Sequence, residues 1–195
     1  MKFRKYFGGE IKEVLNELGN LRIQVFLDFP YLYEGGLEYE KEYLQTYIDS
    51  KESMLFSVWD GNKMVGATTC IPLKDETIEI KEPFENAGIS IEEIFYFGES
   101  ILLKPFRGKG LGHRFFQERE NHVATFDHYK SMYFCGVERA KNHPLKPEDY
   151  QPLDKFWNTR GFAPTALVSY FEWKDIDEET PSKKKMNYWK KDLPQ

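Results

Sequence analysis

The chain has 195 residues, 16% of them aromatic, and a formal net charge of -5 at neutral pH. Its length suits a single domain over residues 1–195 with a sizeable core, and its acidic balance argues against nucleic acid or a membrane surface as a partner, because both attract basic patches. No apolar run approaches the roughly 20 residues that span a bilayer, and the start MKFRKYFGGE lacks a secretory apolar core. Since Cys70 and Cys135 are also too few for a disulfide framework, we expect a cytoplasmic protein.

Alternating and helical apolar patterns follow one another in the first half of the chain. Apolar residues spaced by three and four from Ile11 to Phe26 fall on one helical face, and Pro30 ends that helix. The turn Asp60-Gly61-Asn62 separates two runs of strand-forming residues and predicts a hairpin. The elements expected here are a strand at 3–7, helices at 11–26 and 39–49, strands at 54–59 and 64–73, and then a loop at 74–93 with at most one short helical turn.

The second half begins with an apolar strand at 94–103 and a glycine-rich turn. A helix at 111–126 and a strand at 131–137 follow directly, so the segment 94–137 predicts a crossover unit with two parallel strands. Three prolines make residues 138–152 irregular. The remaining elements expected are a helix at 153–160 capped by Gly161, and strands at 165–173 and 186–191. The whole order predicts a mixed sheet with helices packed on it, an α+β or α/β domain.

The turn after the strand at 94–103 has the composition of an anion site. Gly108, Gly110 and Gly112 allow the backbone to turn sharply and to approach a ligand closely. The helix that follows offers unpaired N–H groups and the positive end of its dipole, which suits a phosphate. Arg107 and Lys109 add two cations to the turn.

Two common phosphate-binding motifs do not fit this turn. A dinucleotide fingerprint needs a small residue where His113 stands, and a Walker loop needs Ser or Thr where Gly110 stands. The pattern R-x-x-G-x-G does fit, as Arg107, Gly108, Lys109, Gly110, Leu111 and Gly112. It resembles the acetyl-CoA-binding motif of the GCN5-related N-acetyltransferases, the GNAT superfamily. The resemblance implies that the backbone amides of residues 108–112 cradle the CoA pyrophosphate.

A second motif and the order of the elements extend the resemblance over nearly the whole chain. The segment FWNTRGF at 156–162 looks like the F-Y-x-x-x-G-F signature that ends the fourth helix in many members. The resemblance implies a GNAT-like mixed, mostly antiparallel sheet of about six to seven strands flanked by about four helices. It also implies acetyl-CoA as co-substrate, no metal, and direct acetyl transfer to a primary amine of a small molecule or an exposed amino group. A non-catalytic acyl-CoA-binding module or sensor is the alternative.

Acyl transfer to an amine needs a base, stabilisation of the oxyanion and a leaving thiolate. Glu99 is the first candidate for the base, since it stands in an otherwise apolar strand; the alternative is an exposed strand-edge glutamate. His143 is a second candidate, because imidazole titrates near neutrality, although a loop histidine is more often simply exposed. The resemblance implies backbone N–H donors for the oxyanion near Leu102 and Leu103, and Asn142 near the cofactor.

Trp157 departs from the family pattern, in which a tyrosine often protonates the departing thiolate. Indole cannot serve as that acid, so the acid is either supplied elsewhere or not needed, because a thiolate leaves readily. Tyr150 is the nearest upstream phenol and a candidate replacement. Trp157 itself is expected to cover the pantetheine arm of CoA.

The segment between the first two expected helices borders the acceptor cleft in GNAT folds. Here it offers Tyr31, Tyr33 and Glu34, and aromatic faces with carboxylates would suit a cationic amine. Tyrosines that simply close the core are the alternative. None of His113, His122 and His128 stands at a metal-ligand spacing from the cysteines, so no metal is expected. A homodimer is possible.

Overall fold

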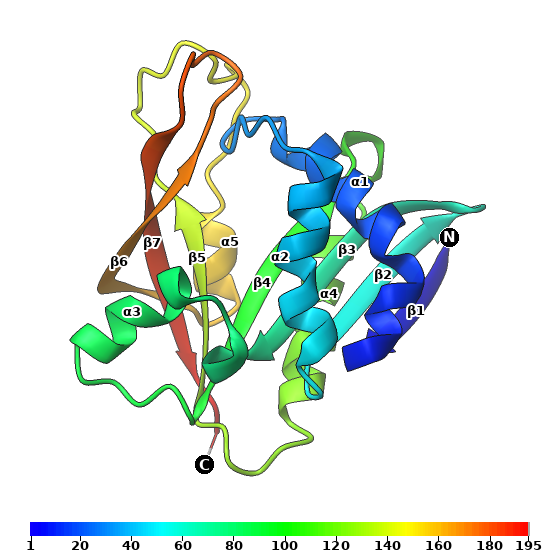
Figure 1. Cartoon of the computed structure of the whole chain (residues 1–195), viewed down its shortest axis with the longest axis vertical. Coiled ribbons are helices and arrows are strands. Elements are labelled where there is room, and N and C mark those ends of the chain that lie inside the picture. The colour runs from blue at the N-terminus through cyan, green and yellow to red at the C-terminus, as the bar shows by residue number, and fades with distance from the viewer. Residues whose placement is uncertain (195) are drawn as a thin grey trace.

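The computed structural model describes residues 1–194, which form one seven-stranded sheet in the order β1-β2-β3-β4-β5-β7-β6 (Figure 1). Neighbouring strands are antiparallel except for the parallel pair β4 and β5. This confirms the predicted mixed, mostly antiparallel sheet and its parallel unit. The strands are β1 Lys2–Phe7, β2 Met54–Asp60, β3 Lys63–Pro72, β4 Ile94–Leu102, β5 Ser131–Val137, β6 Ala163–Trp173 and β7 Ser182–Asp192.

Helices cover both faces of the sheet, with α1 and α2 in front of it and α4 behind it in Figure 1. The described helices are α1 Leu15–Phe26, α2 Leu37–Asp49, α3 Ile78–Asn86, α4 Leu111–Val123 and α5 Asp154–Thr159, with 3-10 turns at Gly8–Val14, Leu73–Asp75 and Lys104–Phe106. Gly19 allows α1 and α2 to approach closely, because a Cβ there would lie 2.8 Å from Leu37 Cδ1. Gly61, in the predicted β2–β3 hairpin, has a φ of 58°.

The prediction for residues 74–93 was wrong, because this stretch contains the nine-residue helix α3 with Pro83 inside it. An interior proline costs a helix about 3 kcal/mol. Ile80 and Phe84, one turn apart, are both buried, and the Phe84 ring lies 5.0 Å from Tyr133 and 5.1 Å from Tyr188. Burying each side chain contributes about 1.5–3 kcal/mol, which offsets the proline. A single apolar pair was too short a pattern to reveal the helix.

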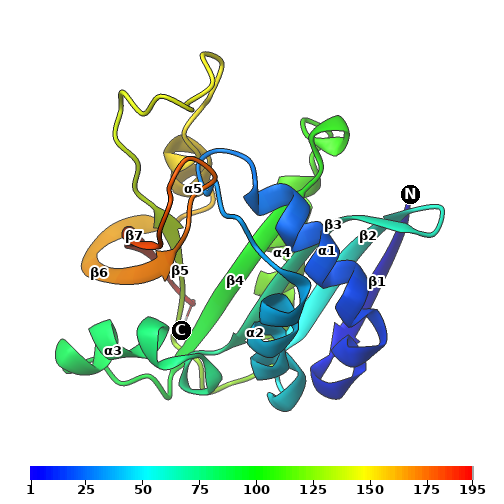
Figure 2. The same ribbon diagram turned by 45° about the horizontal axis from the view of Figure 1, so that its top comes forward.

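β4 and β5 are paired only at their first residues. The register joins Ile94 to Ser131, Phe95 to Met132 and Tyr96 to Tyr133, and no further pairs follow within the described chain. Beyond these pairs the strands β5, β7 and β6 turn away from the β1–β4 part of the sheet, as Figures 1 and 2 show. Residues of both strands line the pocket between them.

Candidate functional site

A large open cleft, with a volume of about 1870 Å³, lies where β4 and β5 separate. Its walls come from α1, α2 and β4 on one side and from β5, α5 and the loop 138–152 on the other. The strand separation therefore creates the cleft, and the residues at its two ends decide what it can bind.

The glycine turn lies beside one end of this cleft, which Leu102 and Arg107 line. Gly108 and Gly110 have φ values of 74° and 79°, and Gly110 caps the N-terminus of α4. Residues with a side chain rarely adopt this left-handed backbone conformation. A Cβ at either glycine would have no neighbour among the described residues within 4 Å. The turn thus presents open backbone at a helix N-terminus, as an anion site requires.

The two cations of the turn contact the protein's own groups. Arg107 Nε donates to the carbonyl oxygen of Leu102 at 3.0 Å, and Lys109 Nζ lies 5.2 Å from the centre of the Phe106 ring. Both side chains are thus engaged within the protein, whereas the backbone at Gly108 and Gly110 is open.

The end of β4 supplies one backbone donor toward the cleft. The N–H of Leu103 already donates to the carbonyl of Val65 at 2.9 Å. Since β3 pairs Gly66 with Leu102, and hydrogen-bonded pairs alternate along an antiparallel ladder, the N–H of Leu102 points away from β3 toward β5. Of the two residues expected to stabilise an oxyanion, Leu102 has the available N–H.

At the other end of the cleft, Arg22 of α1 joins two buried carboxylates. Its Nη1 lies 2.6 Å from Glu99 Oε2 of β4, and its Nε forms an ion pair with Glu40 Oε2 of α2. All three residues are buried yet contribute to the lining of the cleft. The second oxygen of each carboxylate is buried without a hydrogen-bond partner in residues 1–194. Two carboxylates facing one guanidinium leave an excess negative charge, which suits a cationic ligand.

Behind this acidic cluster runs a chain of three hydrogen-bonding side chains. The hydroxyl oxygens of Tyr43 and Tyr47 are 3.3 Å apart, and the Tyr47 hydroxyl donates to Glu76 Oε1 at 2.7 Å. Tyr43 lines the cleft, whereas Tyr47 and Glu76 are buried. Burial raises the pKa of Glu76 to about 7, since a charged carboxylate is poorly solvated there.

The structure separates the other predicted catalytic and cofactor residues. Tyr150 lines the cleft, packs its ring 4.7 Å from Phe29 and has a pKa raised by burial. His143 accepts a hydrogen bond from the backbone N–H of Leu145 and packs on Phe29. Asn142 is exposed, and neither His143 nor Asn142 contributes to the described lining of the cleft.

Trp157 lies in α5 and lines the cleft beside β5. A Cβ at Gly136 would come within 3.0 Å of its ring, and its ring centre is 5.0 Å from Phe134 and 5.1 Å from Trp189. The indole therefore packs α5 against the sheet and also presents an edge to the cleft.

The predicted acceptor residues are divided between the cleft and the surface. Tyr31 and Tyr33 line the cleft, together with Tyr39 and Tyr43 near the acidic cluster. Glu34 instead forms an ion pair with Lys174 at 2.6 Å on the surface and does not contribute to the described lining.

A roof, formed by residues 27–36 and the turn 174–181 between β6 and β7, borders the cleft and carries Tyr31 and Tyr33. Arg139 clamps its two parts: Nε donates to the carbonyl of Pro30 at 2.6 Å and the guanidinium pairs with Asp175. Backbone bonds from Ile176 to Leu32 and from Glu34 to Lys174 add to the clamp. This part of the cleft thus has a defined wall rather than a free loop.

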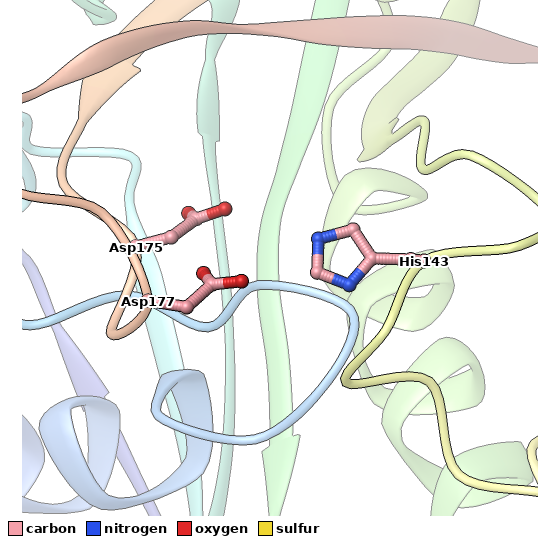
Figure 3. Close-up of side chains that lie close together, drawn as sticks. All are labelled: His143, Asp175 and Asp177. Carbon is pink, nitrogen blue, oxygen red and sulfur yellow. The ribbon is translucent and has the colours of Figure 1, made fainter.

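His143, Asp175 and Asp177 meet at the edge of the roof, with one ligand atom of each within 4.8 Å of the others (Figure 3). Asp175 already accepts from Arg139, from Trp173 Nε1 at 2.8 Å and from Lys184 at 3.2 Å. Two cations on one carboxylate would repel a divalent ion. We therefore assign Asp175 to the structure of the roof rather than to a metal.

Sequence reasoning missed the ionisable residues Arg22, Glu40, Glu76 and Arg119. The last is buried in α4, with its guanidinium carbon 4.2 Å from the centre of the Phe97 ring and its pKa lowered by burial to about 10. The sequence does hint that Arg22, Glu40 and Arg119 are buried, because each stands four residues from a buried apolar residue of its helix. Arg119, for example, lies between Phe115 and Val123. Glu76 carried no such signal.

Among the helices of residues 1–194, none has the length and apolar character needed to cross a membrane. No protein-family model matches the chain, and no curated protein matches its sequence.

Solved structures do resemble it over its whole length. They include NAA60 of Arabidopsis thaliana in complex with a bisubstrate analogue (10% identity, 99% of this chain and 100% of that one, TM-score 0.61). A ribosomal-protein-alanine N-acetyltransferase of Brucella melitensis aligns with 12% identity over 99% and 100% of the two chains, with a TM-score of 0.61. An aminoglycoside 6'-N-acetyltransferase complexed with coenzyme A aligns with 14% identity over 100% and 99%, with a TM-score of 0.59. Other similar structures are described as acetyltransferases of the GNAT family, so the chain has the fold of the GCN5-related N-acetyltransferases, the GNAT superfamily.

Proposed function

We propose that this protein is an acetyl-CoA-dependent N-acetyltransferase that transfers the acetyl group directly to a primary amine. The observation that carries the proposal is the cleft between the separated strands β4 and β5, with the open glycine turn beside one end and the acidic cluster of Arg22, Glu40 and Glu99 at the other. Structures of the same fold contain coenzyme A or a bisubstrate analogue, which supports the assignment of the cofactor.

Each end of the cleft has a role in this reaction. The N–H groups of residues 108–112 would hold the CoA pyrophosphate, and the N–H of Leu102 would stabilise the oxyanion of the tetrahedral intermediate. The acidic cluster and the faces of Tyr31 and Tyr33 would hold the amine as a cation. The acceptor is then a small cationic amine or an exposed amino group of a peptide.

Neither cysteine is suited to act as a nucleophile, which agrees with direct transfer. Cys135 lines the cleft, but burial raises the pKa of its thiol to about 12, and burial does the same to Cys70. A thiolate is the nucleophilic form of cysteine, so an acetyl-cysteine intermediate is disfavoured. We also propose a cytoplasmic location, because two cysteines are too few for a disulfide framework.

A non-catalytic CoA-binding module is the second candidate, and Trp157 supports it, because the tyrosine acid of the family is replaced. Release of free thiol from acetyl-CoA in the presence of a panel of primary amines distinguishes the two. Acceptor-dependent release supports the enzyme. Tight CoA binding without transfer to any amine would support the module instead.

The cofactor site is tested by Gly110→Val, which places a β-branched side chain at a φ of 79°. Because that conformation costs such a residue about 1–2 kcal/mol or more, we expect CoA affinity, measured by calorimetry, to fall about tenfold or more. Gly61→Val is the matched control, since Gly61 also has a positive φ and open surroundings but lies in the β2–β3 turn. CoA affinity that falls equally in both variants, or in neither, contradicts the assigned turn.

A further inference from the structure

The hydrogen-bonded chain Tyr43, Tyr47, Glu76 leads from the wall of the cleft into the protein. Tyr43 stands at the acidic end, where the guanidinium carbon of Arg22 lies 4.5 Å from the centre of its ring. Tyr47 and Glu76 are at most 2% exposed. A Cβ at Gly98 of β4 would come within 2.2 Å of the Tyr47 hydroxyl, so glycine at this position leaves room for the phenol inside the sheet. The path from cleft to carboxylate is therefore continuous and enclosed.

The direction of the chain is fixed at its buried end. Tyr47 gives its proton to the bond with Glu76 Oε1, so within the Tyr43–Tyr47 contact the hydroxyl of Tyr43 must donate. The lone pairs of the Tyr43 oxygen are then the groups that can accept from the cleft. An ammonium group or a water molecule held there meets an acceptor whose proton has a route inward.

Glu99 is already engaged by an arginine. Its Oε2 is 2.6 Å from Arg22 Nη1. Glu76 has no such ion pair among the described residues: it accepts from Tyr47 and, through Oε2, from the backbone N–H of Thr77 at 3.0 Å.

Burial raises the pKa of Glu76 to about 7, and its hydrogen bonds to Tyr47 and Thr77 lower it less. The charged and titratable groups that face it come from every neighbouring element: Arg22 of α1, Tyr43 and Tyr47 of α2, Tyr96 and Glu99 of β4, Cys135 of β5 and Tyr188 of β7. Burial also raises the pKa of Tyr43 and of Tyr47 well above 10, so both phenols stay neutral and only pass protons on.

We propose that Glu76 receives the proton of the acceptor amine through Tyr43 and Tyr47. This inference rests on the proposed acetyl transfer and names the proton path for it. The placement of these three side chains, rather than the family pattern, carries the assignment.

The ammonium of the acceptor gives one proton to Tyr43, Tyr43 gives its own to Tyr47, and Tyr47 gives its own to Glu76, which becomes neutral. The free amine then attacks the thioester carbon, the C–S bond breaks, and the second proton of the nitrogen leaves with the thiolate as a thiol. Glu76 returns its proton to water by the reverse path.

The pH profile of kcat/KM for the best amine of the panel tests the relay. In the wild-type protein, kcat/KM should rise to a plateau with a midpoint near pH 7, where Glu76 ionises. In Glu76→Gln it should be about 10²–10⁴-fold lower at pH 7 and should rise without a break toward the pKa of the amine, about 10.4 for a lysine-like acceptor. CoA affinity should not change.

Tyr43→Phe and Tyr47→Phe each interrupt the chain and should reproduce this profile, and the double variant Tyr43→Phe with Glu76→Gln should lose no more than the slower single variant. Tyr129→Phe is the matched control, because this buried phenol bonds Glu52 outside the chain; its profile should be that of the wild type.

A break near pH 7 that persists in Glu76→Gln, with activity retained, overturns the relay while the acetyltransferase stands. Failure of the wild-type protein to acetylate any amine overturns the proposed function and the relay with it.

Discussion

Arg22 has an unusual position for a cationic side chain, because it is buried between the carboxylates of Glu40 and Glu99. Removal of the guanidinium would leave both carboxylates buried without their ion-pair partner. Arg22→Met should therefore lower the free energy of unfolding by about 3–5 kcal/mol, measured by chemical denaturation at pH 7.

Lys41→Met provides the comparison for that loss, because Lys41 pairs with the exposed Glu38 on the surface of α2. Such pairs contribute about 1 kcal/mol or less. An equal loss in the two variants would show that the charge of Arg22 is not what holds the cluster together.

Glu76 makes stability depend on pH. Its pKa is raised from 4.5 to about 7 in the folded protein, so the folded state holds this proton more tightly than the unfolded chain does. The corresponding stability is present below pH 4.5 and is lost as the pH rises to about 7. Glu76→Gln keeps a neutral side chain at every pH, so its stability relative to wild type should improve between pH 4.5 and pH 8 by about 3 kcal/mol.

Thermal unfolding of both proteins across this pH range measures the difference. Glu85→Gln, at an exposed position of the following helix α3, should show no such trend. If the stability of the wild-type protein relative to Glu76→Gln is constant from pH 4.5 to pH 8, the raised pKa of the buried Glu76 carboxyl is contradicted.

For individual residues, the sequence predicts part of the candidate site. The glycine turn is visible because its residues are contiguous and their backbone requirements are local. Glu99 is visible because a charge interrupts an apolar strand. Its pairing with Arg22 and Glu40 depends on how α1 and α2 cross the sheet, which no local pattern specifies.

Among the elements, the roof over the acceptor end depends most on a single residue. Arg139 bonds the carbonyls of Pro30 and Tyr31 and pairs with Asp175, so one planar guanidinium joins the segments 27–36 and 174–181. Lysine cannot reproduce this forked geometry. In Arg139→Lys, the amides of Glu34 and Ile176, which bond across the roof, should exchange with deuterium about tenfold faster or more, since each 1.4 kcal/mol of lost protection is a factor of ten.

Lys174→Ala is the control for this measurement. Lys174 forms an exposed ion pair with Glu34, so its removal should leave exchange at Ile176 nearly unchanged. Faster exchange throughout the sheet of Arg139→Lys, rather than at the roof, would indicate general destabilisation and contradict a local clamp.

The contrast between the β2–β3 hairpin and α3 shows why some elements are predictable. The hairpin has a turn signal and two long runs of strand formers, so local preference and tertiary packing agree. In α3, local preference opposes the helix through Pro83, and burial of Phe84 against Tyr133 and Tyr188 prevails.

For the molecule as a whole, the strand order could be inferred only in part. The parallel pair β4–β5 follows from the crossover rule, and the sheet confirms it. The sequence does not decide which of the last two strands lies next to β5. In the structure β7, not β6, pairs with β5. Which strand lies inside is settled by the packing of Tyr188 and Trp189 in the core.

Coenzyme A would contact both parts of the divided sheet, so its binding should stabilise the entire fold. At a concentration 100 times the dissociation constant, a ligand adds about 2.7 kcal/mol, which for a chain of this length raises Tm by roughly 5–10 °C. Thermal unfolding measured separately with CoA, with ATP and with NAD tests the assignment of the ligand. Protection by ATP or NAD but not by CoA would indicate a different nucleotide-binding domain.

The cofactor turn and the acidic cluster are built from separate stretches of the chain: the turn from residues 107–112, the cluster from α1, α2 and β4. Natural variation can therefore alter the acceptor end without disturbing the cofactor end. We therefore expect substitutions at Tyr31, Tyr33 or Tyr39, which line the cleft, to change the preference among amines and to leave CoA affinity unchanged.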